Sequence, residues 1–127
     1  MVIKYGLIGY GPHARDHRLL LKYHPKLRKN YKWIASFDPG EKNYELLHKT
    51  AKKHDVICSK SFEEFLNIPN LDAIIINSPP QFHAEQAIAG LESGLHVFSE
   101  IPMAINEKDI EKIISAEEKS KGKYILG

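Results

Sequence analysis

The sequence predicts an α/β fold built on a doubly wound parallel sheet, with helices above and below the sheet in a three-layer αβα arrangement. Strand-like and helix-like segments alternate along the whole chain in the order βαβαβαβαβαβ. Helical crossovers of roughly a dozen residues are right-handed and connect parallel strands. Segment 71–76 contains almost only apolar residues, which is typical of a central strand that is buried on both faces.

In the first half of the chain, β-branched and aromatic residues mark strands, and apolar residues three to four positions apart mark helices. Pro12 suits the first position of a helix, and Pro25 stops that helix. Ser61 and Glu64 form a capping box on a short helix. The expected elements are strands at 2–8, 31–37 and 56–58, and helices at 12–23, at 41–53 and from 61 to before 69.

In the second half, a helix is expected to start at His83 and to end at Gly94, a residue type that often follows the last helical turn. Asn106 with Asp109 starts the last helix. The expected strands are 71–76, 95–98 and 123–126. The buried helix faces are expected to hold Tyr44, Leu47 and Ala51, then Ala84, Ala87, Ile88 and Leu91, and finally Ile110, Ile113 and Ile114.

Length and composition restrict the function. The 127 residues suit a single domain spanning 1–127. With 18 Lys and Arg against 16 Asp and Glu, interleaved, the chain has a formal charge of +2 and is not expected to bind nucleic acid. Cys58 is the single cysteine, so a reducing compartment is expected. No apolar run has the length of a membrane span or a signal peptide, so a cytoplasmic protein without a membrane partner is expected.

The first strand runs into a G-x-G-x-x-A motif that opens a helix, the context that a dinucleotide-binding fingerprint requires. Gly9 allows a tight turn, Gly11 lets a pyrophosphate approach the backbone, and Ala14 lets the helix pack closely on the strand. The alternative is a Gly-rich turn without a ligand. The expected cofactor-binding residues of the motif are Gly9, Tyr10, Gly11, Pro12, His13 and Ala14.

Asp38 ends the second predicted strand, 24 residues after Ala14. An acidic residue about 20 positions beyond the fingerprint accepts hydrogen bonds from the adenosine ribose hydroxyls. A carboxylate there repels a 2′-phosphate, so NAD is expected as the cofactor in preference to NADP. Asp38 could also cap the helix that follows it.

Two further segments follow the fourth and fifth predicted strands: Asn77–His83, with the sequence NSPPQFH, and Ser99–Pro102, with the sequence SEIP. Together with the fingerprint, they resemble the N-terminal half of the Gfo/Idh/MocA oxidoreductases. The pattern of that family is a Gly-rich first turn, a T-P-[NP]-x-x-H segment and an E-K-P segment. The resemblance extends over the whole chain and implies an NAD(P)-binding Rossmann domain that binds a nicotinamide dinucleotide.

The resemblance also implies roles for single residues. Ser78, Pro79 and His83 would lie beside the nicotinamide half of the cofactor, and Glu100 and Pro102 would form the turn under the same pocket. Asn77, at the carboxyl end of its strand, is expected in the same cofactor site. Without the resemblance, His83 would be interpreted as a packing or surface residue.

Two departures from the family pattern limit the expected activity. Ile101 stands where the family has the Lys of E-K-P, and Ile cannot donate a hydrogen bond or move a proton. The α+β substrate domain of the family is expected to be absent. We therefore assign no catalytic residue, expect a small-molecule substrate only where a second domain is supplied, and expect the isolated chain to bind cofactor without efficient turnover.

Other interpretations stay open. A non-catalytic module that senses the nicotinamide cofactor or docks to a partner is the main alternative, and Ile101 favours it. A CoA-binding domain fits less well, since Asp38 suits a free ribose diol. His13 and His17 lack a further ligand, so no metal site is expected. An uncovered apolar patch could support a homo-oligomer.

Overall fold

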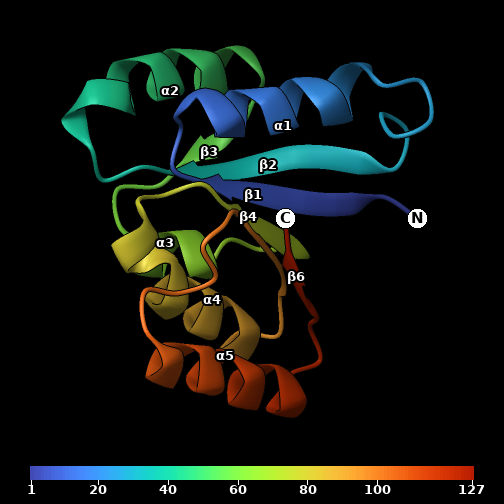
Figure 1. Ribbon diagram of the computed structural model, residues 1–127. Helices are drawn as coiled ribbons and strands as arrows, with labels where there is room; N and C mark the ends of the chain where they lie inside the picture. The colour runs from blue at the N-terminus through green and yellow to red at the C-terminus, as the bar shows by residue number, and fades with distance from the viewer.

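Six parallel strands form one sheet in the computed structural model, which describes residues 1–127 (Figure 1). The strand order is β3-β2-β1-β4-β5-β6, so the direction of winding reverses between β1 and β4. The strands are β1 (Ile3–Ile8), β2 (Tyr31–Phe37), β3 (Ile57–Cys58), β4 (Ala73–Ile76), β5 (His96–Ser99) and β6 (Tyr124–Leu126). Ligands bind at such a reversal, outside the carboxyl ends of the strands.

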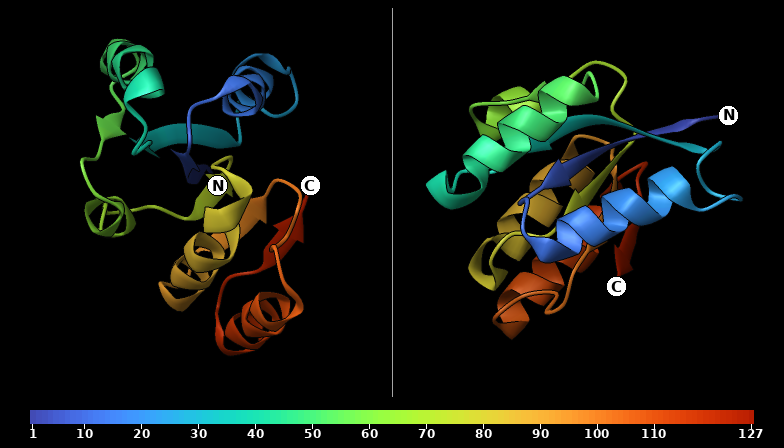
Figure 2. Two further views of the ribbon diagram at one scale, coloured as in Figure 1. Left: turned by 60° about the vertical axis from the view of Figure 1, so that its left-hand side comes forward. Right: turned by 90° about the horizontal axis from the view of Figure 1, so that it is seen from above.

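Helices cover both faces of the sheet, as Figures 1 and 2 show. Helices α1 (Pro12–Tyr23) and α2 (Glu41–Lys53) lie on one face. Helices α3 (Phe62–Leu66), α4 (His83–Glu92) and α5 (Glu107–Lys119) lie on the other. This arrangement confirms the predicted doubly wound, three-layer fold. None of the helices has the length and apolar character that a membrane crossing requires.

The helix boundaries follow the predicted end signals. Pro12 is the first residue of α1. The Ser61 Oγ atom accepts a hydrogen bond from the Glu64 N–H at 3.1 Å, and the Asn106 Oδ1 atom accepts one from the Asp109 N–H at 2.9 Å. A single-turn helix that the sequence did not predict, η1 (Pro80–Phe82), precedes α4.

The main core lies between the sheet and helices α3, α4 and α5. It contains 14 buried residues, including Phe65, Ile74, Ile76 and Ile113. Gly90 brings α4 close to the sheet, because a Cβ there would lie 2.5 Å from the Ile74 Cδ1 atom. Helix α4 therefore packs directly on β4 and β5.

Two predicted core residues face solvent instead. Ile114 is 51% exposed because Ile113, one position earlier, already points into the core and consecutive helical side chains diverge by roughly 100°. Tyr44 is 40% exposed and stacks on His48, one turn further along α2, with 5.7 Å between the ring centroids. The buried side of α2 is formed by Leu47 and Ala51, as predicted.

The opposite face of the sheet has a smaller core. Six buried residues pack there, namely Tyr5, Leu7, Tyr10, Ala14, Leu47 and Ile75. Towards the β6 edge the covering of this face is incomplete, because Ile125 and Leu126 stay 57% and 48% exposed. A largely apolar groove of about 400 Å³ lies between α1 and this part of the sheet, and Phe98 and Ile125 line it.

Candidate functional site

A cleft of about 490 Å³ opens at the carboxyl edge of the sheet, where the winding reverses between β1 and β4. It is bordered by the turns that follow β1, β2 and β4. Its lining residues are Gly9, Tyr10, Gly11, Asp38, Pro39, Gly40, Asn43, Asn77, Ser78, Pro79 and Phe82. Three turns that are distant in the sequence therefore meet at one site.

The turn after β1 is held against two neighbouring strands. Gly9 has a φ of +80°, and its N–H donates to the Phe37 carbonyl oxygen at 2.8 Å. A Cβ at this position would lie 2.8 Å from the backbone of Asn77 and Ser78. Only glycine satisfies both the left-handed conformation and this close backbone approach.

Helix α1 starts at this turn without a side-chain cap. Gly11 is the N-cap residue and offers no side-chain hydrogen bond, and Pro12 has no N–H to satisfy. The first backbone amides of a helix have no partner within the helix. A Cβ at Gly11 would meet no atom within 4 Å, so the space beside these amides is open. An uncapped helix start next to open space is suited to an anion.

Asp38 lies opposite this helix start, with its carboxylate fixed by the backbone. The Tyr10 N–H donates to Oδ2 at 2.7 Å, and the Gly40 N–H donates to Oδ1 at 2.8 Å. Each carboxylate oxygen has two lone pairs, so each can still accept another hydrogen bond. Burial, together with the Asp38 charge, raises the pKa of the Cys58 thiol on β3.

The turn after β4 adds an unsatisfied acceptor. The Asn77 N–H donates to the Ile8 carbonyl oxygen at 2.7 Å, which joins this turn to β1. The Asn77 Oδ1 atom is buried and has no hydrogen-bond partner. The Ser78 hydroxyl donates to the Gln86 side chain on α4. Asn77 is therefore the member of this turn with free hydrogen-bonding capacity.

His83 lies behind the cleft and does not line it. The side chain is 1% exposed. Its Nε2 atom lies 2.6 Å from the Ser78 carbonyl oxygen, and its Nδ1 atom lies 2.7 Å from the Pro102 carbonyl oxygen. The imidazole therefore lies between the turn after β4 and the turn after β5, and a ring nitrogen that carries a proton donates to the carbonyl oxygen beside it. His83 contacts these two turns and is shielded from the cleft by them.

The turn after β5 is also attached to α1. The Glu100 Oε1 atom lies 2.5 Å from the His17 Nε2 atom, and both side chains are about a quarter exposed. The His17 ring packs edge-on against Phe98, with 5.3 Å between the ring centroids. His17 thus pairs with a carboxylate across the sheet edge, and the E-I-P turn is fixed at the mouth of the apolar groove.

The structure divides the predicted site residues into two groups. The cleft lining contains Gly9, Tyr10, Gly11, Asp38, Asn77, Ser78 and Pro79, and does not contain Pro12, His13, Ala14, His83, Glu100 or Pro102. Ala14 is buried against the sheet, as its predicted packing role requires. The Tyr10 ring is buried and stacks on Trp33, so this residue offers the cleft mainly its backbone.

Sequence reasoning missed several residues of the site. Pro39, Gly40, Asn43 and Phe82 also line the cleft, and Phe82 is 39% exposed there. Gly40 and Asn43 follow Asp38 closely, so their proximity was readable from the predicted turn. No local pattern identifies Phe82, which reaches the cleft because η1 turns the chain after Pro79.

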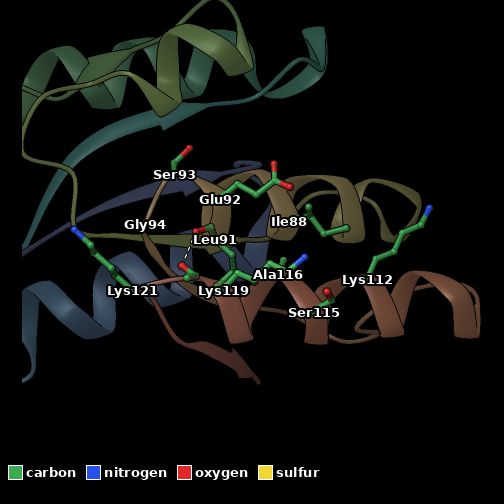
Figure 3. Close-up of a pocket in the computed structure, with 11 residues that line it drawn as sticks. Ile88, Leu91, Glu92, Ser93, Gly94, Lys112, Ser115, Ala116, Lys119 and Lys121 are labelled. Carbon is green, nitrogen blue, oxygen red and sulfur yellow. Dashed lines mark hydrogen bonds between the residues drawn. The ribbon is translucent and has the colours of Figure 1, made fainter.

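A larger groove of about 690 Å³ lies between α4 and α5, away from the cleft (Figure 3). Lysine and serine side chains dominate its lining, and the Ser120 hydroxyl donates to the Leu91 carbonyl oxygen at 2.5 Å. None of the predicted site residues lines this groove. Size alone therefore does not identify the functional site.

Comparison with known proteins gives a family match and curated relatives. The family model described as "Oxidoreductase family, NAD-binding Rossmann fold", Gfo/Idh/MocA, matches residues 3–127. An α-N-acetylgalactosaminidase from Shewanella oneidensis is 38% identical over 60 residues, which cover 47% of this chain and 13% of that protein. A glycosyl hydrolase family 109 protein from a Shewanella species is 35% identical over 60 residues with the same coverage.

Solved structures share the whole fold. The WlbA dehydrogenase from Chromobacterium violaceum, determined with NADH and UDP-GlcNAcA, has a TM-score of 0.87 and 25% identity. A probable dehydrogenase from Thermotoga maritima has a TM-score of 0.85 and 27% identity, and the apo scyllo-inositol dehydrogenase from Lactobacillus casei has 0.84 and 25%. These matches cover 98 to 99% of this chain but only 35 to 36% of the other chains. The chain thus spans about a third of the length of these dehydrogenases.

Proposed function

The chain belongs to the Gfo/Idh/MocA oxidoreductase family as its NAD-binding Rossmann domain, and from this premise we propose that NAD(H) binds in the cleft between the Gly9 turn and Asp38. The observation that carries the proposal is the uncapped start of α1, which faces open space beside a carboxylate that the backbone holds in place. Free amides suit a pyrophosphate, and a carboxylate suits a ribose diol.

The residues present fit a dinucleotide. The missing Cβ at Gly11 leaves room for a phosphate at the helix start. The buried, unpartnered Asn77 Oδ1 atom provides an acceptor in the same cleft. When bound, NAD(H) supplies hydride exchange at its nicotinamide ring. The residues of this chain orient that ring and exclude water from it.

For the nicotinamide half, we propose an indirect role for His83. Its two ring nitrogens lie next to the Ser78 and Pro102 carbonyl oxygens, so the ring packs between the turns after β4 and β5. The hydrogen bond between Glu100 and His17 fixes the second turn against α1. The turns after β4 and β5 would form the floor of the nicotinamide pocket. Because His83 and His17 restrict the movement of these turns, a bound nicotinamide ring would keep one orientation.

We propose that NAD(H) is preferred over NADP(H). Both Asp38 oxygen atoms already accept backbone N–H groups, so the carboxylate cannot turn away from a ligand without losing two hydrogen bonds. A 2′-phosphate would meet this negative charge. Neither Pro39 nor Gly40, the next two residues, offers a cation to offset the repulsion.

For the whole protein, we propose an oxidoreductase that acts on a hydroxyl-rich, sugar-like small molecule. The WlbA dehydrogenase structure contains UDP-GlcNAcA, and two other relatives are named for scyllo-inositol and N-acetylgalactosamine. All three of these compounds carry several hydroxyl groups. We place substrate recognition and the remaining catalytic residues in a second domain. Residues 1–127 supply the cofactor site.

A second candidate is a module that binds NAD(H) without chemistry, because Ile101 occupies the position of the family's Lys. Ile101 is 67% exposed and has no group that could donate to a substrate hydroxyl. Restoring the amine by Ile101→Lys, in a protein that includes a substrate domain, discriminates the two candidates. A gain of dehydrogenase turnover would favour an enzyme that lost one group, and no gain would favour the module.

Calorimetric titration of the 127-residue chain with NADH and with NADPH tests the cofactor proposal. We expect NADH to bind at least tenfold more tightly than NADPH, a difference of about 1.4 kcal/mol. Asp38→Asn should weaken NADH binding by about tenfold or more and reduce the discrimination, because a charge-assisted hydrogen bond contributes roughly 1.5 to 3 kcal/mol.

Glu111→Gln is the matched control, since it removes an exposed carboxylate from α5 without touching the cleft. Failure of both dinucleotides to bind at millimolar concentration would refute the site. Equal affinities for NADH and NADPH would retain the site but refute the role of Asp38.

A further inference from the structure

A second cavity, of about 200 Å³, lies between α1 and α2, away from the carboxyl edge. Its residues come from β1, the second half of α1, the amino end of β2, the segment between α1 and β2, and the carboxyl end of α2. It shares no residue with the dinucleotide cleft. Figure 2 shows α1 and α2 side by side above this part of the sheet. The cation-lined cavity, as we call it, is lined by Arg18, Lys22, Arg28, Lys32 and His54 together with three aromatic rings.

Positive charge is concentrated there without compensation. Four Lys and Arg side chains line a space that contains no carboxylate, whereas the whole chain has a net charge of only +2. None of the four lies within salt-bridge distance of a carboxylate, unlike Lys112, which pairs with Asp109 on α5. Cations that are gathered without acidic partners attract an anion from solution.

Arg18 is held in place but remains unsatisfied. Its guanidinium lies over the Trp33 ring, with 5.4 Å to the ring centroid. The Trp33 Nε1–H group donates to the Ala35 carbonyl oxygen at 2.8 Å and lies 3.0 Å from Ser36 Oγ, which fixes the ring. The Arg18 Nε atom is buried and has no acceptor. A guanidinium that is ordered by stacking has lost entropy before any ligand arrives, which favours binding.

The same positive charges affect the pKa of His54. Burial, followed by the charges of Lys22, Arg18 and Lys53, lowers the pKa of this histidine. Its ring lies 6.2 Å from the Trp33 ring, centroid to centroid. The charges of Arg18 and Lys22, both on α1, thus act on the space next to His54. A dianion bound in that space would reduce the repulsion between these two cations.

We propose that the cation-lined cavity binds a phosphate-type dianion, either free or as the phosphate ester of a small metabolite. Arg18 provides a planar, bidentate donor, and Lys22 and Lys32 add point charges. At about 200 Å³ the space is smaller than the roughly 300 to 1,000 Å³ of a typical small-molecule site. It therefore suits a phosphoryl group and excludes a dinucleotide.

The fluorescence of Trp33 provides a direct assay, because it is the single tryptophan of the chain and lines the cavity. The protein is titrated with inorganic phosphate at constant ionic strength, which sodium chloride maintains. We expect a saturable change in emission and a matching calorimetric signal. Glycerol 3-phosphate, titrated in the same way, distinguishes an ester site from a site for the free ion by which of the two binds more tightly.

Arg18→Gln combined with Lys22→Gln should weaken phosphate binding at least tenfold by calorimetry. The matched control is Lys108→Gln combined with Lys119→Gln, which removes the same charge from α5 and should leave binding unchanged. A response that does not saturate, or that falls equally in both double variants, would overturn the proposal. Phosphate would then act only as a nonspecific counterion for surface lysine and arginine side chains. NADH titration of the Arg18 and Lys22 variant reports separately on the dinucleotide cleft.

Discussion

Gly9 and Gly11 provide a matched pair of substitutions that separates folding from binding. In Gly9→Ala, the new Cβ would lie 2.8 Å from backbone atoms of Asn77 and Ser78, at a φ of +80°. The left-handed conformation costs an alanine about 1 to 2 kcal/mol, and overpacking costs about 1 to 3 kcal/mol more. The free energy of unfolding should therefore fall by about 2 to 5 kcal/mol.

Gly11→Ala should leave stability nearly unchanged. Gly11 has a φ of −79° and a ψ of −170°, and a Cβ there meets no atom within 4 Å. Alanine fits this conformation and reduces the entropy of the unfolded chain, which stabilises a protein by about 0.4 to 1 kcal/mol. Alanine is a poorer N-cap than glycine by a similar amount, however, so the two effects nearly cancel. The methyl group would nevertheless occupy the space beside the free amides of α1, so NADH affinity should fall at least tenfold.

Thermal unfolding and calorimetric titration of the two variants provide the test. For a chain of this size, 1 kcal/mol shifts Tm by about 4 °C, so Gly9→Ala should lower Tm by about 8 to 20 °C. Gly11→Ala should leave it nearly unchanged. If Gly11→Ala bound NADH as tightly as the original chain, the phosphates would not approach this turn, and our placement of the cofactor would be refuted. If Gly9→Ala unfolded at the original temperature, the argument from close backbone approach would be wrong.

Three further predictions concern single side chains. His83→Gln should lower the free energy of unfolding, measured by urea titration, by about 2 to 4 kcal/mol. The reason is that one amide cannot reach both the Ser78 and the Pro102 carbonyl oxygens. Unchanged stability would contradict the link between the two turns. Cys58 should react with iodoacetamide at pH 8 more slowly than in the urea-unfolded chain, because its pKa is raised, first by burial and then by Asp38, and Asp38→Asn should speed the native reaction. His54 has a pKa below 6.5 in the folded chain, so the native state binds fewer protons than the unfolded state, and stability should decrease as pH falls through 6.5. Tm measured from pH 7.5 to 5 should show that decrease, and a profile that His54→Gln leaves unchanged would assign it to other groups.

The sequence predicted the fold because its local and long-range signals agree. The strand before Gly9, the Pro12 helix start and the apolar strand ending at Ile76 each match the order that the sheet requires. Local signals also predicted Ser61 and Asn106 as caps. Which residues of a helix are buried was less predictable, as Ile114 shows. A side chain near the edge of the apolar face becomes exposed when the helix is rotated by a few tens of degrees about its axis.

The parts of the site that depend on neighbouring residues in the sequence were predictable, whereas contacts between distant segments were not. Asp38 and the Gly9 turn can be read from spacing, since the motif and its acidic partner occur on consecutive strands. Contacts between distant segments leave no such trace: the His17 pair with Glu100 spans 83 residues, and the Arg18 stack on Trp33 joins a helix to a strand. Both exist only because the sheet places α1 next to β5 and β2.

The partly covered sheet also implies an order in which the backbone opens. β6 contains three residues and pairs only with β5, and its side chains Ile125 and Leu126 are 57% and 48% exposed. β1 is paired on both sides and contributes Leu7 and Ile8 to the two cores. Amide protons of β6 should therefore exchange with solvent deuterium through local opening, whereas those of β1 should exchange only when the whole domain unfolds. Protection from exchange should increase across the sheet from β6 to β1, with the strands that hold the dinucleotide cleft at the protected end.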